Sequence, residues 1–322
     1  MSDSEILQSL SVDELLHEAR ARESQSEAPA SATGATTETR FQNIELATIV
    51  ETVKHRQEVI YGVDDRQDVF EITDQAILDD ADSVVLVCGQ NEVDDDGDGS
   101  SSLQTQNFGT SRNLCATEPF RDQPTTGFCS GFLVAPDIIA TAGHCVDASN
   151  VTTRRFVFGF RMLSATEART VIDNSEIYRG VDIIGHQLAG DGADWALVRI
   201  DRPVPNHRVV SIRRRGLIEN DEALHVIGHP VGLPTKVAGG AKVRDNSPSA
   251  FFVANLDTYG GNSGSPVFNS ETHEVEGILV RGETDFISNG TCIESLKCPN
   301  AGCRGEDCTR TTEFAQFIPQ ES

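Results

Sequence analysis

The chain has 322 residues, with 26 basic and 50 acidic side chains and a formal net charge of −24. This length predicts one or two domains, and an apolar fraction of 38% is enough to form a buried core. The negative charge argues against nucleic-acid binding because an acidic surface repels phosphate. The chain contains no run of eighteen apolar residues, the length that would predict a membrane-spanning helix.

The first 58 residues predict a leader that precedes the folded domain. The apolar residues between positions 6 and 16 recur at spacings typical of a short amphipathic helix. The run 28–37 is small and polar, which predicts a flexible or disordered linker. The acidic start lacks the basic segment and the apolar stretch of a secretory signal peptide.

From residue 59 onward, short apolar runs alternate with Gly, Pro, Asn and Asp. Runs of this length favour strands over helices. The predicted strands cover residues 83–87, 131–134, 137–140, 155–160, 195–200, 223–227, 250–254, 265–268 and 275–280. The pattern predicts an all-β domain, either a barrel or a pair of packed sheets.

Three segments carry candidate catalytic chemistry: Thr141-Ala-Gly-His144-Cys145, Asp194-Trp-Ala-Leu-Val and Gly260-Gly-Asn-Ser263-Gly-Ser-Pro. Alone, each has a simpler interpretation as a structural histidine, a capping aspartate or a glycine-rich turn. Together they supply a hydroxyl nucleophile, an imidazole base and a carboxylate that orients the imidazole, as nucleophilic acyl transfer requires. The chain order His, Asp, Ser differs from that of α/β-hydrolases and subtilisins.

These motifs, together with Cys129-Ser-Gly-Phe-Leu-Val, resemble the trypsin-like serine peptidases, and within them the bacterial glutamyl-endopeptidase (V8-like) group. The resemblance runs from about residue 59 to the end. It implies two six-stranded antiparallel β-barrels of chymotrypsin type with the active site between them. We expect barrel one over about residues 59–205 and barrel two over about 206–322, behind the leader at 1–58.

The resemblance also implies the roles of the candidate residues. Ser263 would be the nucleophile, His144 the general base, and the backbone N–H groups of Gly261 and Ser263 the oxyanion hole. Asp194 would orient His144. Asp182, Asp191 and Asp201 are competing acids, but only Asp194 precedes the apolar strand that the family motif requires.

Substrate specificity is predicted from three positions. Asp257 lies six residues before Ser263, where trypsin-like relatives carry the acid that selects Arg or Lys; a turn cap is the simpler interpretation. Leu279 stands where glutamyl-specific relatives carry a histidine, and Gly282 would keep the pocket wall open. We therefore expect an endopeptidase that prefers Arg or Lys at P1. The alternative is a catalytically silent peptide-binding protein on the same fold.

The segment after residue 58 is similar to the mature start of V8-like enzymes. It predicts a propeptide that ends near Glu58, while a first strand with a polar leader is the alternative. The expected partners are protein or peptide substrates, with no nucleic acid and no membrane span, and the expected state is a monomer.

The eight cysteines predict disulfides and an extracellular or periplasmic location, although no signal peptide is visible. The resemblance implies a Cys129–Cys145 disulfide, with two buried thiols as the alternative. The other six could form three more bridges: Cys88, Cys115, Cys292, Cys298, Cys303 and Cys308. The last four lack the Cys-x2-Cys spacing of common zinc sites, so a zinc-binding adaptor is the less favoured hypothesis.

No metal or cofactor is expected from the remaining motifs. The acidic run 94–99 opens like a calcium loop, but Thr105 stands where a bidentate Glu belongs, which favours a solvated loop over a calcium site. His225 and His229 lie four residues apart without the Glu of a metalloprotease motif, and we interpret them as structural.

Overall fold

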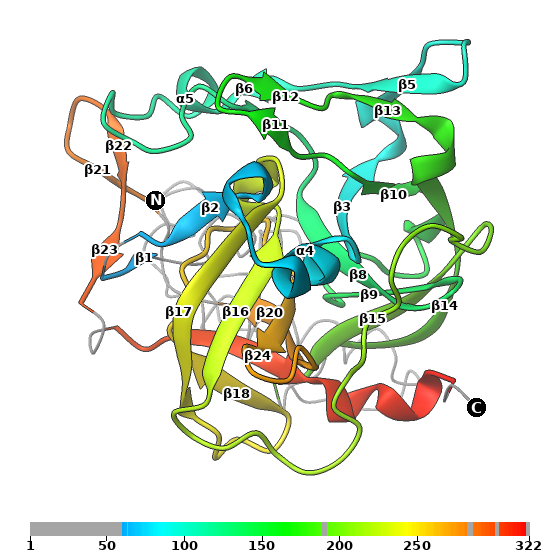
Figure 1. The fold of residues 1–322 in the computed structure, drawn as a ribbon, viewed down its shortest axis with the longest axis vertical. Helices are drawn as coiled ribbons and strands as arrows, with labels where there is room; N and C mark the ends of the chain where they lie inside the picture. The colour runs from blue at the N-terminus through cyan, green and yellow to red at the C-terminus, as the bar shows by residue number, and fades with distance from the viewer. Residues whose placement is uncertain (1–59, 63, 189–191, 282–285, 300–302, 320–322) are drawn as a thin grey trace, which may run out of the picture.

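The computed structural model describes residues 60–62, 64–188, 192–281, 286–299 and 303–319. The predicted leader over residues 1–58 lies outside these residues. The described chain forms two closed six-stranded antiparallel β-barrels with few helices (Figure 1). This confirms the predicted all-β, chymotrypsin-like fold.

Barrel one closes in the order β10, β14, β15, β9, β8, β3. Its strands are β3 (Val84–Gly89), β8 (Cys129–Ala135), β9 (Ile138–Thr141), β10 (Arg154–Phe158), β14 (Ile177–Leu188) and β15 (Asp194–Ile200).

Barrel two follows the order β16, β19, β20, β24, β18, β17, and β16 also pairs with β17 to close it. Its strands are β16 (Ala223–Gly228), β17 (Lys236–Asp245), β18 (Phe251–Ala254), β19 (Pro266–Asn269), β20 (Val275–Arg281) and β24 (Glu306–Arg310).

Short strands, helices and 3-10 turns lie outside the twelve barrel strands. The strands are β1 (Ile60–Tyr61), β2 (Arg66–Asp68), β4 (Val93–Asp95), β5 (Ser100–Leu103), β6 (Gln106–Asn107), β7 (Pro124–Thr125), β11 (Met162–Ser164), β12 (Glu167–Ala168), β13 (Val171–Asp173), β21 (Phe286–Ser288), β22 (Ile293–Ser295) and β23 (Lys297–Cys298). The helices are α4 (Gln75–Ala81) and α5 (Phe108–Ser111), and the 3-10 turns are η2 (Val69–Glu71), η3 (Gln90–Glu92), η4 (Val151–Thr153), η5 (Asn174–Glu176), η6 (Pro230–Gly232), η7 (Thr311–Glu313) and η8 (Ala315–Phe317).

All nine apolar runs of the sequence lie in barrel strands, whereas β14, β17 and β24 had no such signal. In β14 buried and exposed residues mix along twelve positions, and β17 contains the pair Gly239 and Gly240. Strand β24 reads Glu-Asp-Cys-Thr-Arg, yet all five residues are buried. A run of polar residues that the fold buries cannot be recognised from hydrophobicity.

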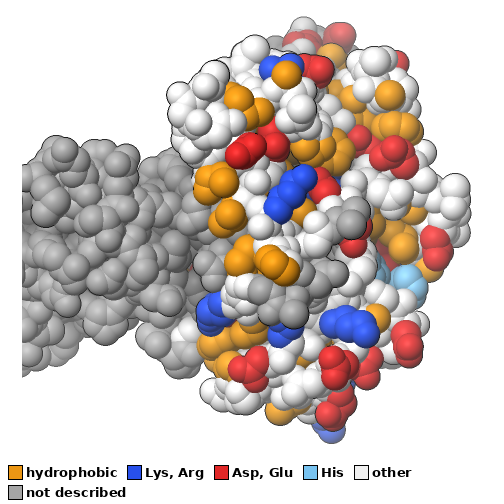
Figure 2. All heavy atoms as spheres, turned by 90° about the vertical axis from the view of Figure 1, so that its left-hand side faces the viewer, with side chains coloured by type: hydrophobic (Ala, Val, Ile, Leu, Met, Phe, Trp, Pro, Cys, Tyr) orange, Lys and Arg blue, Asp and Glu red, His pale blue; other side chains and the backbone are white. Residues whose placement is uncertain are grey.

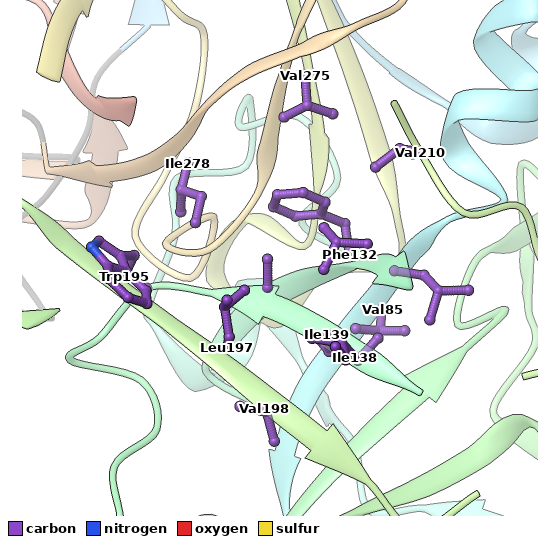
Figure 3. Close-up of a cluster of buried hydrophobic side chains, with 14 of the residues drawn as sticks. Val85, Phe132, Ile138, Ile139, Trp195, Leu197, Val198, Val210, Val275 and Ile278 are labelled. Carbon is purple, nitrogen blue, oxygen red and sulfur yellow. The ribbon is translucent and has the colours of Figure 1, made fainter. Parts of the chain in front are cut away.

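One apolar cluster lies between the barrels. Figure 3 shows Phe132 and Trp195 of barrel one beside Val275 and Ile278 of barrel two. These four side chains are buried, and complete burial of such a side chain stabilises a fold by roughly 1.5–3 kcal/mol. The cluster therefore fixes one barrel against the other, which sets the geometry of any site between them.

The first described residues pair with the C-terminal half of the chain. Strand β1 pairs in parallel with β23, and β2 pairs antiparallel with β17 of barrel two. Helix α4 then leads into β3, the first strand of barrel one. The segment around residues 60–68, which was expected with barrel one, thus contributes its strands to the barrel-two side.

Three disulfides are present: Cys129–Cys145, Cys115–Cys292 and Cys298–Cys303. The first confirms the pairing that the family resemblance implies. The expectation of three further bridges is wrong, because Cys88 and Cys308 are buried thiols in separate barrels.

On the face shown in Figure 2, acidic side chains lie among basic and apolar ones instead of forming one continuous acidic surface. Among the described residues, no helix is long and apolar enough to cross a membrane.

Candidate active site

His144 and Asp194 meet because adjacent strands of barrel one place them together. His144 follows β9 and Asp194 begins β15, and these two strands pair directly. The Nδ1 of His144 lies 2.7 Å from Oδ2 of Asp194, and the His144 backbone N–H donates to Oδ1 at 3.1 Å. The carboxylate therefore holds both the ring and the backbone of His144. It favours the tautomer with the proton on Nδ1 and a lone pair on Nε2.

The other ring nitrogen of His144 is available. Its Nε2 is buried and has no hydrogen-bond partner within the part of the chain that the structure describes. A buried imidazole nitrogen with a free lone pair can accept a proton from a neighbouring hydroxyl.

Close packing explains why a glycine, Gly143, precedes His144. A Cβ there would lie 2.5 Å from the carbonyl oxygen of Gln187 and 3.0 Å from Oδ1 of Asp194. The Gly143 carbonyl is in turn 2.9 Å from Nε2 of His186 on β14. The Thr-Ala-Gly-His motif thus reflects a close backbone approach that only glycine permits.

Asp194 is also tied to barrel two. Its backbone N–H donates to Oγ1 of Thr309 on β24 at 3.1 Å, and both residues are buried. The start of β15 therefore keeps its position relative to both barrels.

Ser263 lies in the loop between β18 and β19, beside the histidine segment. Its carbonyl oxygen accepts from the Ser130 N–H of β8 at 2.8 Å and lies 3.7 Å from Sγ of Cys145. The next residue, Gly264, has φ +90°, and a Cβ there would lie 2.0 Å from the Ser130 carbonyl oxygen. The Ser-Gly pair of the motif is therefore fixed by contact with barrel one.

The loop that carries Ser263 also contains two backbone donors, the N–H groups of Gly261 and Ser263. The N–H of Val231 donates to the carbonyl of Gly260, and because a peptide unit is planar and trans, the N–H of Gly261 must point away from Val231. Within the described residues, neither the Gly261 N–H nor the Ser263 N–H donates to an internal acceptor. Gly261 has φ +95°, a backbone conformation that residues with a side chain rarely adopt.

Sequence reasoning missed two residues that hold this loop. The Oγ of Ser130 donates to the Gly261 carbonyl at 3.1 Å and accepts from the His229 N–H at 2.9 Å. Val231 has φ +49°, which is unusual for a β-branched residue, and its carbonyl accepts from Oγ1 of Thr125. A serine inside an apolar run and a valine in a His-Pro-Val-Gly turn carry no recognisable sequence signal.

Asp257 is engaged by the N-terminal segment. Its Oδ1 accepts from the Tyr61 N–H at 2.6 Å, its Oδ2 accepts from the Asp65 N–H at 3.2 Å, and the residue is only 3% exposed. Burial raises the pKa of Asp257. Burial and the neighbouring Asp257 raise the pKa of Asp65 to about 7. In this arrangement the carboxylate anchors Tyr61 and Asp65 and is not presented to a substrate side chain.

The other two predicted pocket residues do not join Asp257 in an open pocket. Leu279 is fully buried in the apolar cluster of barrel two, and its backbone pairs with Gly264 and Ser265. Gly282 lies outside the described residues.

The acidic run 94–99 forms the tip of the β4–β5 hairpin. Oδ1 of Asp95 accepts from the Gly97 N–H at 2.9 Å, and Oδ1 of Asp98 accepts from the Ser100 N–H at 3.0 Å. Oδ2 of Asp96 accepts from the Ser102 hydroxyl at 3.0 Å. These carboxylates cap the turn, and residues 94–99 are exposed.

Comparison with known proteins bears on the identity of the domain. Residues 129–278 match the family model of the trypsin-like peptidase domain, while no curated protein matches the chain. Among solved structures, a Glu endopeptidase in complex with MPD is 18% identical with a TM-score of 0.48, covering 81% of this chain and 97% of that one. The VesB protease of Vibrio cholerae is 11% identical with a TM-score of 0.48, covering 80% and 67%. The family match spans His144, Asp194 and Ser263, and residues 129–278 are thus similar to a trypsin-like peptidase domain.

Proposed function

We propose that the protein is a serine endopeptidase that hydrolyses peptide bonds through an acyl-enzyme. The observation that carries the proposal is the His144–Asp194 pair: Nδ1 is held at 2.7 Å from the carboxylate, and Nε2 is buried and unpartnered among the described residues, beside the Ser263 loop. Asp182 and Asp201 have other partners, namely the Ile183 and Arg179 backbone N–H groups, and Asp191 lies outside the described residues.

In the proposed reaction, the Ser263 hydroxyl attacks the scissile carbonyl carbon and its proton passes to Nε2 of His144. The tetrahedral intermediate collapses as the C–N bond breaks, and His144 returns the proton to the leaving amine. Water then attacks the acyl carbon while His144 takes its proton. His144 passes that proton to Oγ of Ser263 as the acyl C–O bond breaks, which releases the acid and regenerates the hydroxyl. Asp194 keeps the ring oriented and stabilises the imidazolium throughout, so these steps require no cofactor.

The free N–H groups of Gly261 and Ser263 would bind the developing oxyanion. Such donors act because they are already oriented before charge develops, and loss of one comparable donor costs about 10²–10³ in kcat. The peptide plane of Gly260–Gly261, held by Val231, supports this role.

The test is cleavage of a peptide library by the purified protein, as the full chain and as a chain beginning at Val59, with Ser263→Ala as the control. Turnover that is lost in Ser263→Ala, together with labelling of Ser263 by a fluorophosphonate, is the expected result. Binding of peptides without turnover by the folded wild-type protein would instead support the silent peptide-binding protein.

We propose the preference for Arg or Lys at P1 from the sequence positions of Asp257, Leu279 and Gly282, of which Asp257 would supply the charge. Leaving the Tyr61 and Asp65 N–H groups unpaired would cost about 1–3 kcal/mol each, so a substrate cation would have to displace this segment to reach the carboxylate. The same library decides the point. A basic preference that disappears in Asp257→Asn would assign Asp257 to the pocket, and an unchanged profile would leave it as the anchor of residues 61–65.

We further propose that residues 1–58 are removed as a propeptide near Glu58. Ile60 and Tyr61 are buried, so packed structure begins within two residues of that point. N-terminal sequencing of the active species should give a start near Val59.

The three disulfides support an extracellular or periplasmic location.

A further inference from the structure

A second cluster of chemically active side chains lies apart from His144, Asp194 and Ser263. Asp80 lies near the end of α4, His225 on β16, and His273 in the turn between β19 and β20. Oδ2 of Asp80 is 3.1 Å from Nε2 of His225 and 2.5 Å from Nδ1 of His273. One ligand atom from each of the three residues lies within 4.8 Å of the others.

The cluster is rigid on two sides. Asp80 is 1% exposed, and the ring of His225 is stacked on Phe268 with centroids 5.0 Å apart and an interplanar angle of 7°. The remaining nitrogen of His225, Nδ1, is 3.1 Å from Oγ of Ser270. A hydrogen bond to the second ring nitrogen is the outer-shell contact that orients histidine ligands in metal sites.

The third side is open. The side chain of His273 is 24% exposed, so this side of the cluster reaches the surface. His273 has φ +56°, so the turn holds this residue in a conformation that its neighbours must support.

We infer that Asp80, His225 and His273 form a binding site for a divalent transition metal of the zinc class. Two imidazole nitrogens and one carboxylate, with an open position for water, are a donor set that zinc accepts in proteins. The cation would take the place of the two imidazole protons now directed at Asp80. Among the described residues, the Lys or Arg side chain paired with Asp80 is Arg208, whose Nη1 lies 4.0 Å from Oδ1, whereas the two histidines face Oδ2.

The site would act as a clamp between the barrels. Helix α4 leads from β2 into β3 of barrel one, whereas both histidines belong to barrel two, and Figure 1 shows α4 between the two barrels. A bound metal would cross-link them at a point that none of the proposed catalytic residues touches. The inference does not depend on the proposed peptidase activity.

The experiment uses the full chain with its disulfides intact, stripped with a chelator and then given Zn²⁺ alone. We expect about one zinc per chain after gel filtration, measured by elemental analysis, and a rise in melting temperature of about 5 °C or more at ~100-fold excess over Kd. His273→Asn should lower zinc affinity by at least ~10-fold, since even outer-shell changes cost that much. Asn tolerates the left-handed backbone conformation, which keeps this partly exposed turn intact.

The matched control is His207→Asn. His207 is also a histidine between carboxylates, with Nδ1 2.9 Å from Asp82 and Nε2 2.5 Å from Glu176, but it lies outside the cluster. Zinc binding that survives in His207→Asn and weakens in His273→Asn supports the site. Absence of stoichiometric zinc in the wild type, or an equal loss in both variants, overturns it.

Discussion

At the scale of single residues, Ser130 links the two halves of the proposed site. Its backbone N–H holds the Ser263 carbonyl, while its hydroxyl joins the Gly261 carbonyl to the His229 N–H. Ser130 is buried, so water does not replace these bonds when the hydroxyl is removed. We regard Ser130 as a positioning residue that acts through the Gly261–Ser263 loop and does not touch substrate.

Replacement of this hydroxyl gives the first prediction. Ser130→Ala should lower the free energy of unfolding by about 1–3 kcal/mol because two buried polar groups lose their partner. It should also lower kcat by ~10-fold or more with little change in KM, because a displaced loop misplaces the oxyanion donors. Urea unfolding and steady-state kinetics measure the two effects.

The matched control for this variant is Ser101→Ala. Ser101 is equally a buried serine, and its hydroxyl donates to Oδ1 of Asn174 at 2.6 Å, away from the site. It should lose stability and keep kcat. A fall of kcat in both variants would mean that Ser130 affects activity only through stability.

At the scale of elements, the turn η6 positions the Gly260–Gly261 peptide. Val231 donates to the Gly260 carbonyl from a left-handed conformation, which in a β-branched residue costs on the order of 1–3 kcal/mol. The hydroxyl of Thr125, in β7, accounts for part of the restraint because it donates to the Val231 carbonyl. Strand β7 thus helps to fix the direction of the Gly261 N–H.

The second prediction removes that restraint. Thr125→Val should lower kcat several-fold and leave KM nearly unchanged, at a stability cost of about 1 kcal/mol for one hydrogen bond. The comparison variant is Thr311→Val, which removes the hydroxyl that donates to the Arg213 carbonyl at 2.7 Å. Equal kcat values for Thr125→Val and the wild type would show that η6 holds its shape without β7.

The N-terminal segment gives a third prediction, which depends on pH. The pKa of Asp65 is raised to about 7 by burial and by Asp257, so the folded state retains a proton that the unfolded state loses near pH 4. The stability contributed by this proton is complete below that pH and is lost as pH rises to about 7. Hydrogen exchange of the Tyr61 amide, corrected for its intrinsic rate, should therefore be faster at about pH 8 than at about pH 5.

Asp65→Asn is the control for this effect, since the amide does not ionise. Its Tyr61 exchange, corrected in the same way, should depend less on pH over that range, with any remaining dependence coming from Asp257, which accepts the Tyr61 N–H. A wild-type pH dependence that persists in Asp65→Asn would assign the effect to another group.

The sequence predicted the strands that bury continuous apolar runs and the segments that carry His144, Asp194 and Ser263, because these follow local patterns. It could not predict contacts made between distant segments. Cys115 and Cys292 are 177 positions apart, and nothing in their spacing distinguishes this pair from the other combinations. Asp257 matches a pocket position by its distance from Ser263, but only the fold reveals that Tyr61 and Asp65 lie against it.

At the scale of the whole molecule, His207 holds the long connection between the barrels, residues 201–222, against barrel one. Its ring is stacked on Phe158 of barrel one with centroids 4.0 Å apart, and it lies between Asp82 and Glu176. Burial by itself would lower the pKa of His207, but the hydrogen bonds and charges of the two carboxylates outweigh it and raise the pKa. Through its two nitrogens the ring joins the connection to Asp82 and Glu176 of barrel one, and its protonated form donates to both carboxylates.

The sign of the resulting pH dependence follows from linkage. A folded-state pKa above the unfolded value of about 6.5 means that the contribution of His207 to stability is complete below that pH and is lost as pH rises through the folded pKa. The difference in unfolding free energy between the wild type and His207→Gln should thus be larger at about pH 6 than at about pH 9. Urea unfolding of both proteins at the two pH values measures it. The comparison cancels other titrating groups, among them His229, whose pKa burial lowers to about 4. A difference that stays constant with pH would show that the ring stabilises the connection by stacking on Phe158 and not by its charge.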